Sequence, residues 1–195
     1  MRGLLAGLVL LLAASSAIAQ VKDSGWYVGA GFGSTYLQSV CNGFQDAGGY
    51  ESCDDTSVGW KVLLGKNIYK YTYLEGEYTD AGEAKIVAPG STGNISVNPR
   101  IASLFLKFLV PVGFQDRLGV YAKFGGTYYD TTYDGTGVYA GAEGDDGVNT
   151  AIGAGVSWRG WNHFSLLFEW ENFNDAAVVR DGDVNMGSIS LLYHF

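Results

Sequence analysis

The stretch "GWYVGAGFGSTYL", residues 25–37, decides the fold class of this chain. Its three glycines, Gly29, Gly31 and Gly33, suggest either a phosphate-binding loop or one face of a β-strand. A dinucleotide-binding loop has the pattern Gly-x-Gly-x-x-Gly between an apolar strand and a helix, and here the third glycine comes one residue early. Apolar residues recur at even-numbered positions, namely Trp26, Val28, Ala30, Phe32 and Tyr36, with Ser34 as the exception. A period of two predicts a strand with its glycines on the opposite face.

Residues 1–19, "MRGLLAGLVLLLAASSAIA", have the features of a secretory signal peptide. One arginine precedes a short apolar run, and small residues lead to a cleavage site before Gln20. No later segment reaches the ~20 apolar residues of a membrane-spanning helix. We therefore expect an exported chain whose residues 20–195 form one domain.

Composition narrows the function classes. The formal net charge of −8 argues against a nucleic-acid partner. The 29 glycines and 13 tyrosines favour a protein of many strands and turns over a helical bundle.

The alternation of the opening stretch returns seven more times. The further segments are 57–65, 72–79, 102–110, 120–128, 152–158, 164–171 and 188–195. Each has one strongly apolar face, and aromatic residues gather near the strand ends on that face: Trp26, Tyr78, Trp158, Trp170 and Phe195. Interfacial girdles of membrane barrels have this composition. The three prolines, Pro89, Pro99 and Pro111, are expected outside strand interiors.

The connections between these segments alternate in length. Three short turns and four long loops fit an all-β fold, an eight-stranded antiparallel up-and-down transmembrane β-barrel with both termini on the short-turn, periplasmic side. A secreted β-sandwich or lipocalin-like barrel, with its apolar faces turned inward, remains the alternative.

Charged residues fall on the faces that the barrel would turn inward. They are Lys61, Glu75, Glu77, Lys107, Lys123, Glu169 and Glu171. Because unpaired buried charges are costly, we expect these groups to neutralise one another in an ionic cluster. A proton or ion pathway is the alternative, although the interior of an eight-stranded barrel is just wide enough to be filled by side chains.

The sequence gives weaker support to two other activities, lipid hydrolysis and metal binding. His163, Ser165 and Glu169 or Glu171 suggest a hydrolase acting on lipid A, but His163 would lie at the periplasmic end. The long loops carry many carboxylates, which could bind calcium, yet "DGDVNMG" at 181–187 lacks the spacing of a calcium loop. No His or Cys cluster has zinc spacing. We expect no metal and no cofactor.

Cys41 and Cys53, the only cysteines, both fall in the first long loop. In an exported chain the pair predicts a disulfide, with free thiols as the alternative.

The chain end "SISLLYHF" and the stretches "GWYVGAGFG", "LEGEYTDAG", "LFLKFLVPV" and "GVYAKFGGTYY" resemble the transmembrane domain of the OmpA-like outer-membrane β-barrel family. The resemblance implies that Tyr193 and Phe195 form the signal read by the outer-membrane assembly machinery, with Ser190 where a glycine is usual. It places the family's interior charges on Glu75, Lys107, Lys123 and Glu169. Gly31, Ser157 and Leu167 stand where three others belong, which leaves the relatives' internal gate in doubt. No periplasmic domain follows, so we expect a barrel-only member.

Three functions stay open. The first is a structural or surface-interaction protein, an adhesin or protective protein, embedded in outer-membrane lipid and meeting a host or environmental ligand through acidic outer loops. The second is a lipid-modifying enzyme of the lipid A deacylase kind, and the third is a small diffusion channel.

Overall fold

The computed structural model describes residues 25–38, 40–41, 50–112, 117–137, 140, 144–161, 163–176 and 182–195. The predicted signal peptide lies outside these residues. Within the described ranges, no helix has the length and apolar character needed to cross a membrane.

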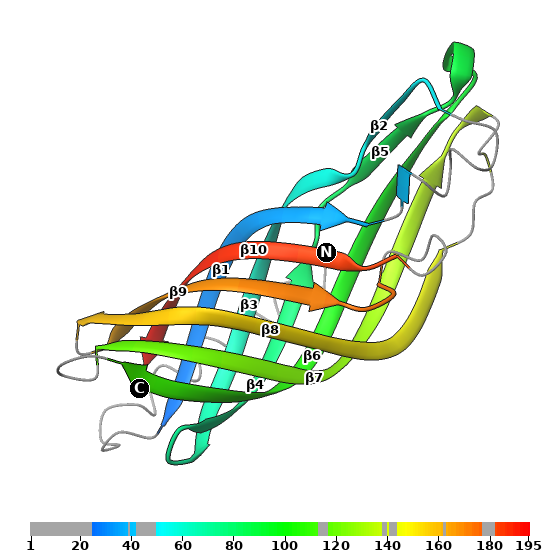
Figure 1. The fold of residues 1–195 in the computed structure, drawn as a ribbon. Coiled ribbons are helices and arrows are strands. Elements are labelled where there is room, and N and C mark those ends of the chain that lie inside the picture. Colours follow the sequence, from blue (N-terminus) through cyan, green and yellow to red (C-terminus); the bar gives the residue numbers. More distant parts are fainter. Residues whose placement is uncertain are drawn as a thin grey trace, which may run out of the picture.

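Eight antiparallel strands form a closed ring (Figure 1). They are β1 Trp26–Leu37, β3 Thr56–Tyr69, β4 Thr72–Asp80, β6 Asn94–Val112, β7 Leu118–Gly135, β8 Asp145–Trp161, β9 Phe164–Phe173 and β10 Val184–His194. The first and last strands close the ring, pairing from Tyr27 opposite His194 to Leu37 opposite Val184. The predicted eight-stranded barrel is confirmed. The first residue of β1, Trp26, and the last residue of β10, His194, both lie at the end of the barrel that carries the short turns.

The two faces of each strand differ sharply in burial. On β1, Phe32 is 66% exposed whereas Tyr27 is 2% exposed. The exposed faces carry large apolar residues around the ring, among them Leu64, Leu104, Phe124, Ile152 and Phe168. The inward faces carry the charged residues instead. A water-soluble barrel or sandwich would have the opposite arrangement, so that alternative is wrong.

The glycines of the opening stretch occupy inward-facing positions of β1, and an added side chain at these positions would have no room. A Cβ at Gly31 would lie 2.1 Å from Ser190 Oγ, and one at Gly33 would lie 2.0 Å from the backbone oxygen of Gly187. The absence of side chains at Gly31 and Gly33 therefore allows the final strand to pack closely against β1 and close the ring.

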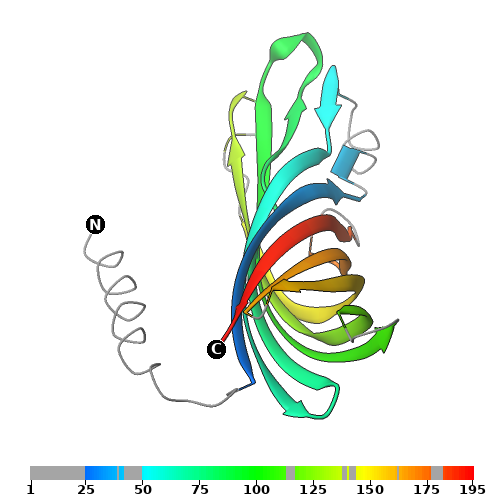
Figure 2. The same ribbon diagram turned by 90° about the vertical axis from the view of Figure 1, so that its left-hand side faces the viewer.

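Several strands continue beyond the segments that the sequence predicted. Tyr129–Gly135 of β7, predicted as loop, pairs with Ile95–Ile101 of β6. A short strand β5 (Ala84–Val87) and the 3-10 turn η1 (Pro89–Ser91) lead back into β6, and β2 (Ser52–Asp54) pairs with β5. Figure 2 shows these strands rising past the rest of the ring at the long-loop end. The prediction of long loops failed here because polar residues in an extension above the lipid still satisfy their backbone groups by pairing.

Pro99 and Pro111 correct a second prediction, because both lie within β6. The backbone oxygen of Pro99 accepts a hydrogen bond from Ala81 N, and Leu109 N donates to Tyr71 O, so odd-numbered residues of β6 direct their backbone groups towards β4. Pro99 and Pro111 fall just beyond the two ends of the β4 pairing, which spans Arg100 to Phe108. The ladder from Arg100 to Phe108 therefore loses no hydrogen bond, and at Pro99, whose oxygen still bonds Ala81 N, the missing N–H affects only a position beyond that ladder.

Candidate functional site

The seven predicted interior charges meet in the middle of the barrel. They come from five strands, and each residue is at most 5% exposed. Three lysines face four glutamates, so the cluster has one excess negative charge when every group is ionised. Strand periodicity places these side chains inward, and ring closure brings the five strands within reach of one another.

Lys123 lies at the centre of this ionic cluster. Its Nζ lies 3.1 Å from Glu75 Oε1, 3.0 Å from Glu77 Oε2, 3.1 Å from Glu169 Oε1 and 2.6 Å from Glu171 Oε1. Its ammonium also lies 4.3 Å from the centre of the Phe105 ring, a cation–π contact. One cation thus serves four carboxylates in a site closed to water.

Lys61 and Lys107 complete the neutralisation unequally. Lys61 Nζ contacts Glu169, Glu171 at 2.5 Å and Glu77 at 3.5 Å. Lys107 Nζ contacts Glu75 at 2.9 Å. The part of the cluster around Lys61 and Lys123 therefore contains more ion pairs than the part beside Lys107.

Three hydroxyl groups that the sequence analysis missed also belong to the cluster. Tyr27 donates to Glu75 at 2.5 Å, Tyr121 donates to Glu169 at 2.7 Å, and Thr79 donates to Glu77 at 2.9 Å. All three occupy inward positions of their strands. The sequence could have identified them, because they are hydroxyl-bearing residues on the same alternating strand faces as the charged residues.

The carboxylates of Glu77, Glu169 and Glu171 converge within 4.8 Å, a spacing that could suit a metal ion. However, the ammonium groups of Lys61 and Lys123 each contact all three carboxylates. These lysines supply the positive charge that a metal would bring. The donor set therefore fits an ion-pair network better than a metal centre.

Apolar layers lie on both sides of the ionic cluster. Along β9, Leu167 comes first, Glu169 and Glu171 follow, and Phe173 comes last. Leu167 belongs to a small buried cluster on the short-turn side, and Phe173 to a larger one on the long-loop side that includes Leu37, Ile101 and Phe105. Charged and apolar side chains therefore fill successive layers of the interior.

The serine of the hydrolase hypothesis has a different partner from the one expected. Ser165 Oγ lies 2.9 Å from His194 Nε2, whereas His163 Nδ1 lies 3.1 Å from the backbone oxygen of His194. Glu169 and Glu171 are engaged by lysines. The geometry does not form the His163–Ser165–glutamate arrangement that the alternative hydrolase hypothesis would require.

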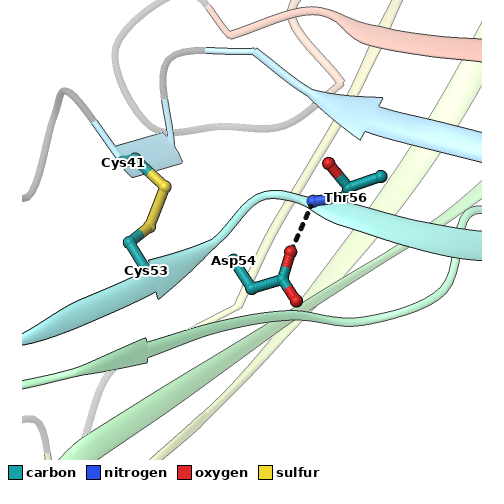
Figure 3. The surroundings of a disulfide bond; sticks show 4 residues. All are labelled: Cys41, Cys53, Asp54 and Thr56. Carbon is teal, nitrogen blue, oxygen red and sulfur yellow. Dashed lines mark hydrogen bonds between the residues drawn. A yellow bond between two sulfur atoms is a disulfide. The ribbon is translucent and has the colours of Figure 1, made fainter.

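The disulfide between Cys41 and Cys53 is confirmed (Figure 3). It joins the segment after β1 to the short strand β2, whose partner β5 continues the barrel wall. Just past the bridge, Asp54 accepts a hydrogen bond from Thr56 N at 3.2 Å, and β3 begins there. The bridge thus links the first outer loop to the extended part of the sheet.

Carboxylates dominate the long-loop end of the described chain. They are Glu51, Asp54, Asp55, Asp80, Glu83, Asp130, Asp134, Asp145, Asp146, Asp175 and Asp183, and the cations of the same end are Lys85 and Arg100. Asp46, Glu143 and Asp181 of the predicted acidic loops lie outside the described residues. This end of the molecule is strongly negative.

Tyr193 and Phe195 lie at the other end. Their rings are 5.1 Å apart in an edge-to-face contact, and Phe195 N donates to the backbone oxygen of Trp26 at 3.0 Å. The terminal residues are thus held against the first strand. Their role as an assembly signal remains a prediction.

A closed ring of eight antiparallel strands, apolar outside and charged inside, defines an outer-membrane β-barrel protein. Residues 5–195 match the family model described as "Outer membrane protein beta-barrel domain", and the chain belongs to this family. None of the curated proteins matches the chain significantly.

Solved structures with the same fold include three bacterial outer-membrane proteins. Ail of Yersinia pestis, crystallised with the heparin analogue sucrose octasulfate, has 12% identity and a TM-score of 0.57, covering 87% of this chain and 97% of Ail. The N-terminal barrel of Pseudomonas aeruginosa OprF has 14% identity and a TM-score of 0.56 over 89% and 100%. Neisserial surface protein A has 13% identity and a TM-score of 0.56 over 90% and 100%. The likeness extends over the whole barrel, and the protein is located in the outer membrane.

Proposed function

We propose that this protein is a non-enzymatic surface-interaction protein, in which the barrel is the anchor and the acidic long-loop end is the binding surface. The observation that carries the proposal is the filled interior. Apolar layers on both sides of the ion-pair network leave the described barrel without a continuous aqueous route, which disfavours a diffusion channel. The outer end is then the part of the molecule available to partners.

The outer end also has the order that a recognition surface needs. Strands β2, β7 and β8 hold exposed carboxylates on paired backbone: Asp54, Asp130, Asp134, Asp145 and Asp146. Strands β5 and β6 carry no carboxylate but pair with β2 and β7 and keep these segments in the sheet. The disulfide restrains the first loop against the same sheet. Restraint of this kind lowers the entropic cost of binding.

The charge of this surface indicates the chemistry of the partner. Eleven described carboxylates against two cations, counted in the set given above, favour a basic protein or peptide. The heparin analogue in the Ail crystal is a polyanion. We expect this chain to differ from Ail in that respect, because a polyanion would be repelled here.

Binding of charged probes to the full chain in lipid nanodiscs tests the proposal. A decalysine peptide should bind at low salt and weaken steeply above physiological ionic strength, whereas heparin should not bind. A variant with Asp130, Asp145 and Asp146 changed to asparagine should bind decalysine at least several-fold more weakly. Lys66→Gln, which alters charge at the opposite end, serves as the control.

Planar-bilayer recording tests the channel alternative on the same preparation. We expect no steady conductance above that of the lipid. Steady, voltage-independent conductance, or decalysine binding that the triple asparagine variant leaves unchanged, would contradict the proposed function.

A further inference from the structure

The short-turn end of the barrel contains a cavity of about 180 Å³ that opens to solvent. This volume is far above the roughly 10–15 Å³ that one water molecule needs. Lys70, Arg117 and Arg159 line its rim, Lys107 lies deeper, and Ser165 and His194 lie on one wall. No Asp or Glu is among the described residues that line it.

Separate parts of the sheet bring these cations to one mouth. Lys70 stands in the turn between β3 and β4, with a positive φ of 37°. Arg117 and Arg159 are neighbours across β7 and β8, because Arg159 N donates to Arg117 O at 2.7 Å. The convergence results from ring closure, since the short turns of a barrel all end at the same rim.

The rim cations have no described acidic partner. Within the described chain, no carboxylate lies within 4.0 Å of the charged groups of Lys70, Arg117 or Arg159, in contrast to the densely paired lysines of the barrel centre. Below them, Lys107 is already paired with Glu75 and stacks 4.2 Å from the centre of the Tyr121 ring. The cavity therefore has a positive rim above a neutralised floor.

We propose that this cavity is a binding site for a phosphate ester. Two guanidinium groups can each donate two parallel hydrogen bonds to an oxyanion, and an ammonium adds a point charge. The Ser165 hydroxyl, hydrogen-bonded to His194, and the Tyr73 side chain lie on the wall and supply neutral polar groups. Several cations around one cavity suit an anion that carries up to two charges on several oxygens.

Given the position of the cavity, the phosphate group can come from two sources. The short-turn end faces the periplasm, at the level of the inner-leaflet headgroups. A phospholipid would reach the cavity with its headgroup over the short-turn rim, and a small phosphorylated solute would enter directly from the periplasm. Charge along the barrel axis supports both, because the opposite end is acidic and would repel the same ligand.

The test measures binding of two phosphate probes to the full chain in phosphate-free detergent. Calorimetric titration with glycerol 1-phosphate reports the soluble source, and native mass spectrometry with phosphatidylglycerol reports the headgroup source. Diacylglycerol, which has the tails without the phosphate, is the control ligand. We expect at least one probe to bind, and diacylglycerol not to be retained.

The variants locate the site. Arg117→Gln with Arg159→Gln should weaken binding at least tenfold. Arg117→Lys with Arg159→Lys, which keeps the positive charge, should retain part of the affinity. Arg100→Gln, at the exposed opposite end of the barrel, should leave binding unchanged. Heat-modifiable gel migration checks that each variant is folded.

Retention of phosphatidylglycerol alone assigns the headgroup source, and titration by glycerol 1-phosphate alone assigns the soluble source. Failure of both probes, or equal losses in the Arg100 variant and in the double variant, overturns the proposal. Neither result bears on the outer surface, because decalysine binding is measured at the other end.

Discussion

Lys123→Met is the most informative substitution in the barrel. Methionine keeps most of the length of the side chain but removes the cation that contacts four carboxylates at 2.6–3.1 Å. Three lysines against four glutamates become two against four in a site that excludes water. Breaking a buried ion pair typically costs about 3–5 kcal/mol, because the remaining charge is left uncompensated. We expect a loss in unfolding free energy of at least this size.

The assay is urea unfolding of the barrel in lipid vesicles, followed by tryptophan fluorescence and by heat-modifiable migration. Lys85→Met is the matched control, since its side chain is 66% exposed and, among the described residues, it pairs only with Glu83. It should cost less than about 1 kcal/mol. Lys107→Met, which removes a cation with one carboxylate contact in the described part of the chain, should fall between the two.

A second substitution tests whether charge, not volume, causes the loss. Glu171→Gln in the Lys123→Met background restores the original excess of one negative charge. The double variant should be more stable than additivity predicts, by at least about 1 kcal/mol. A cost for Lys123→Met within 1 kcal/mol of wild type, or strict additivity, would refute the reasoning.

The same unfolding assay checks two further substitutions, and proteolysis checks a third. Leu104→Arg, on an outward position that is 57% exposed, should cost about 2–4 kcal/mol in vesicles, and a cost near zero would mean that this face does not meet lipid. Gly33→Ala should destabilise by roughly 1–3 kcal/mol because its Cβ meets backbone at 2.0 Å, whereas Gly76→Ala, whose Cβ would lie 3.9 Å from Leu64 O, should be close to neutral. Cys41→Ser with Cys53→Ser should leave heat-modifiable folding intact yet increase protease cleavage of the loop between β1 and β3, since closing such a loop contributes up to about 3 kcal/mol; unchanged cleavage would count against the restraint.

Periodicity allowed the barrel and its inward charges to be predicted from the sequence. A strand alternates its side chains strictly, so the inward position of Glu75 follows once Leu74 is assigned to lipid. The disulfide followed from export and from the placement of two cysteines in one loop. These features depend on neighbours along the chain, or on the compartment, and a single sequence reports both.

The limits of the strands could not be predicted in this way. The polar stretch after Tyr128 reads as loop, because its residues lack the apolar face that lipid imposes. It is strand because β6 continues beside it and pairs with it up to Gly135. Pro99 was likewise expected outside a strand, yet it lies within β6. A proline fits there because the pairing with β4 ends at Arg100, and the sequence alone does not show where that pairing ends.

What the sequence by itself determined is the class of protein, an exported eight-stranded barrel with a charged interior, because alternation and turn spacing are local properties. Only the tertiary structure decided which charges pair, that Ser165 meets His194 and not His163, and that Lys70, Arg117 and Arg159 share one cavity. The physical reason is ring closure. It fixes the register between strands distant in sequence, and one residue of register decides which side chains meet.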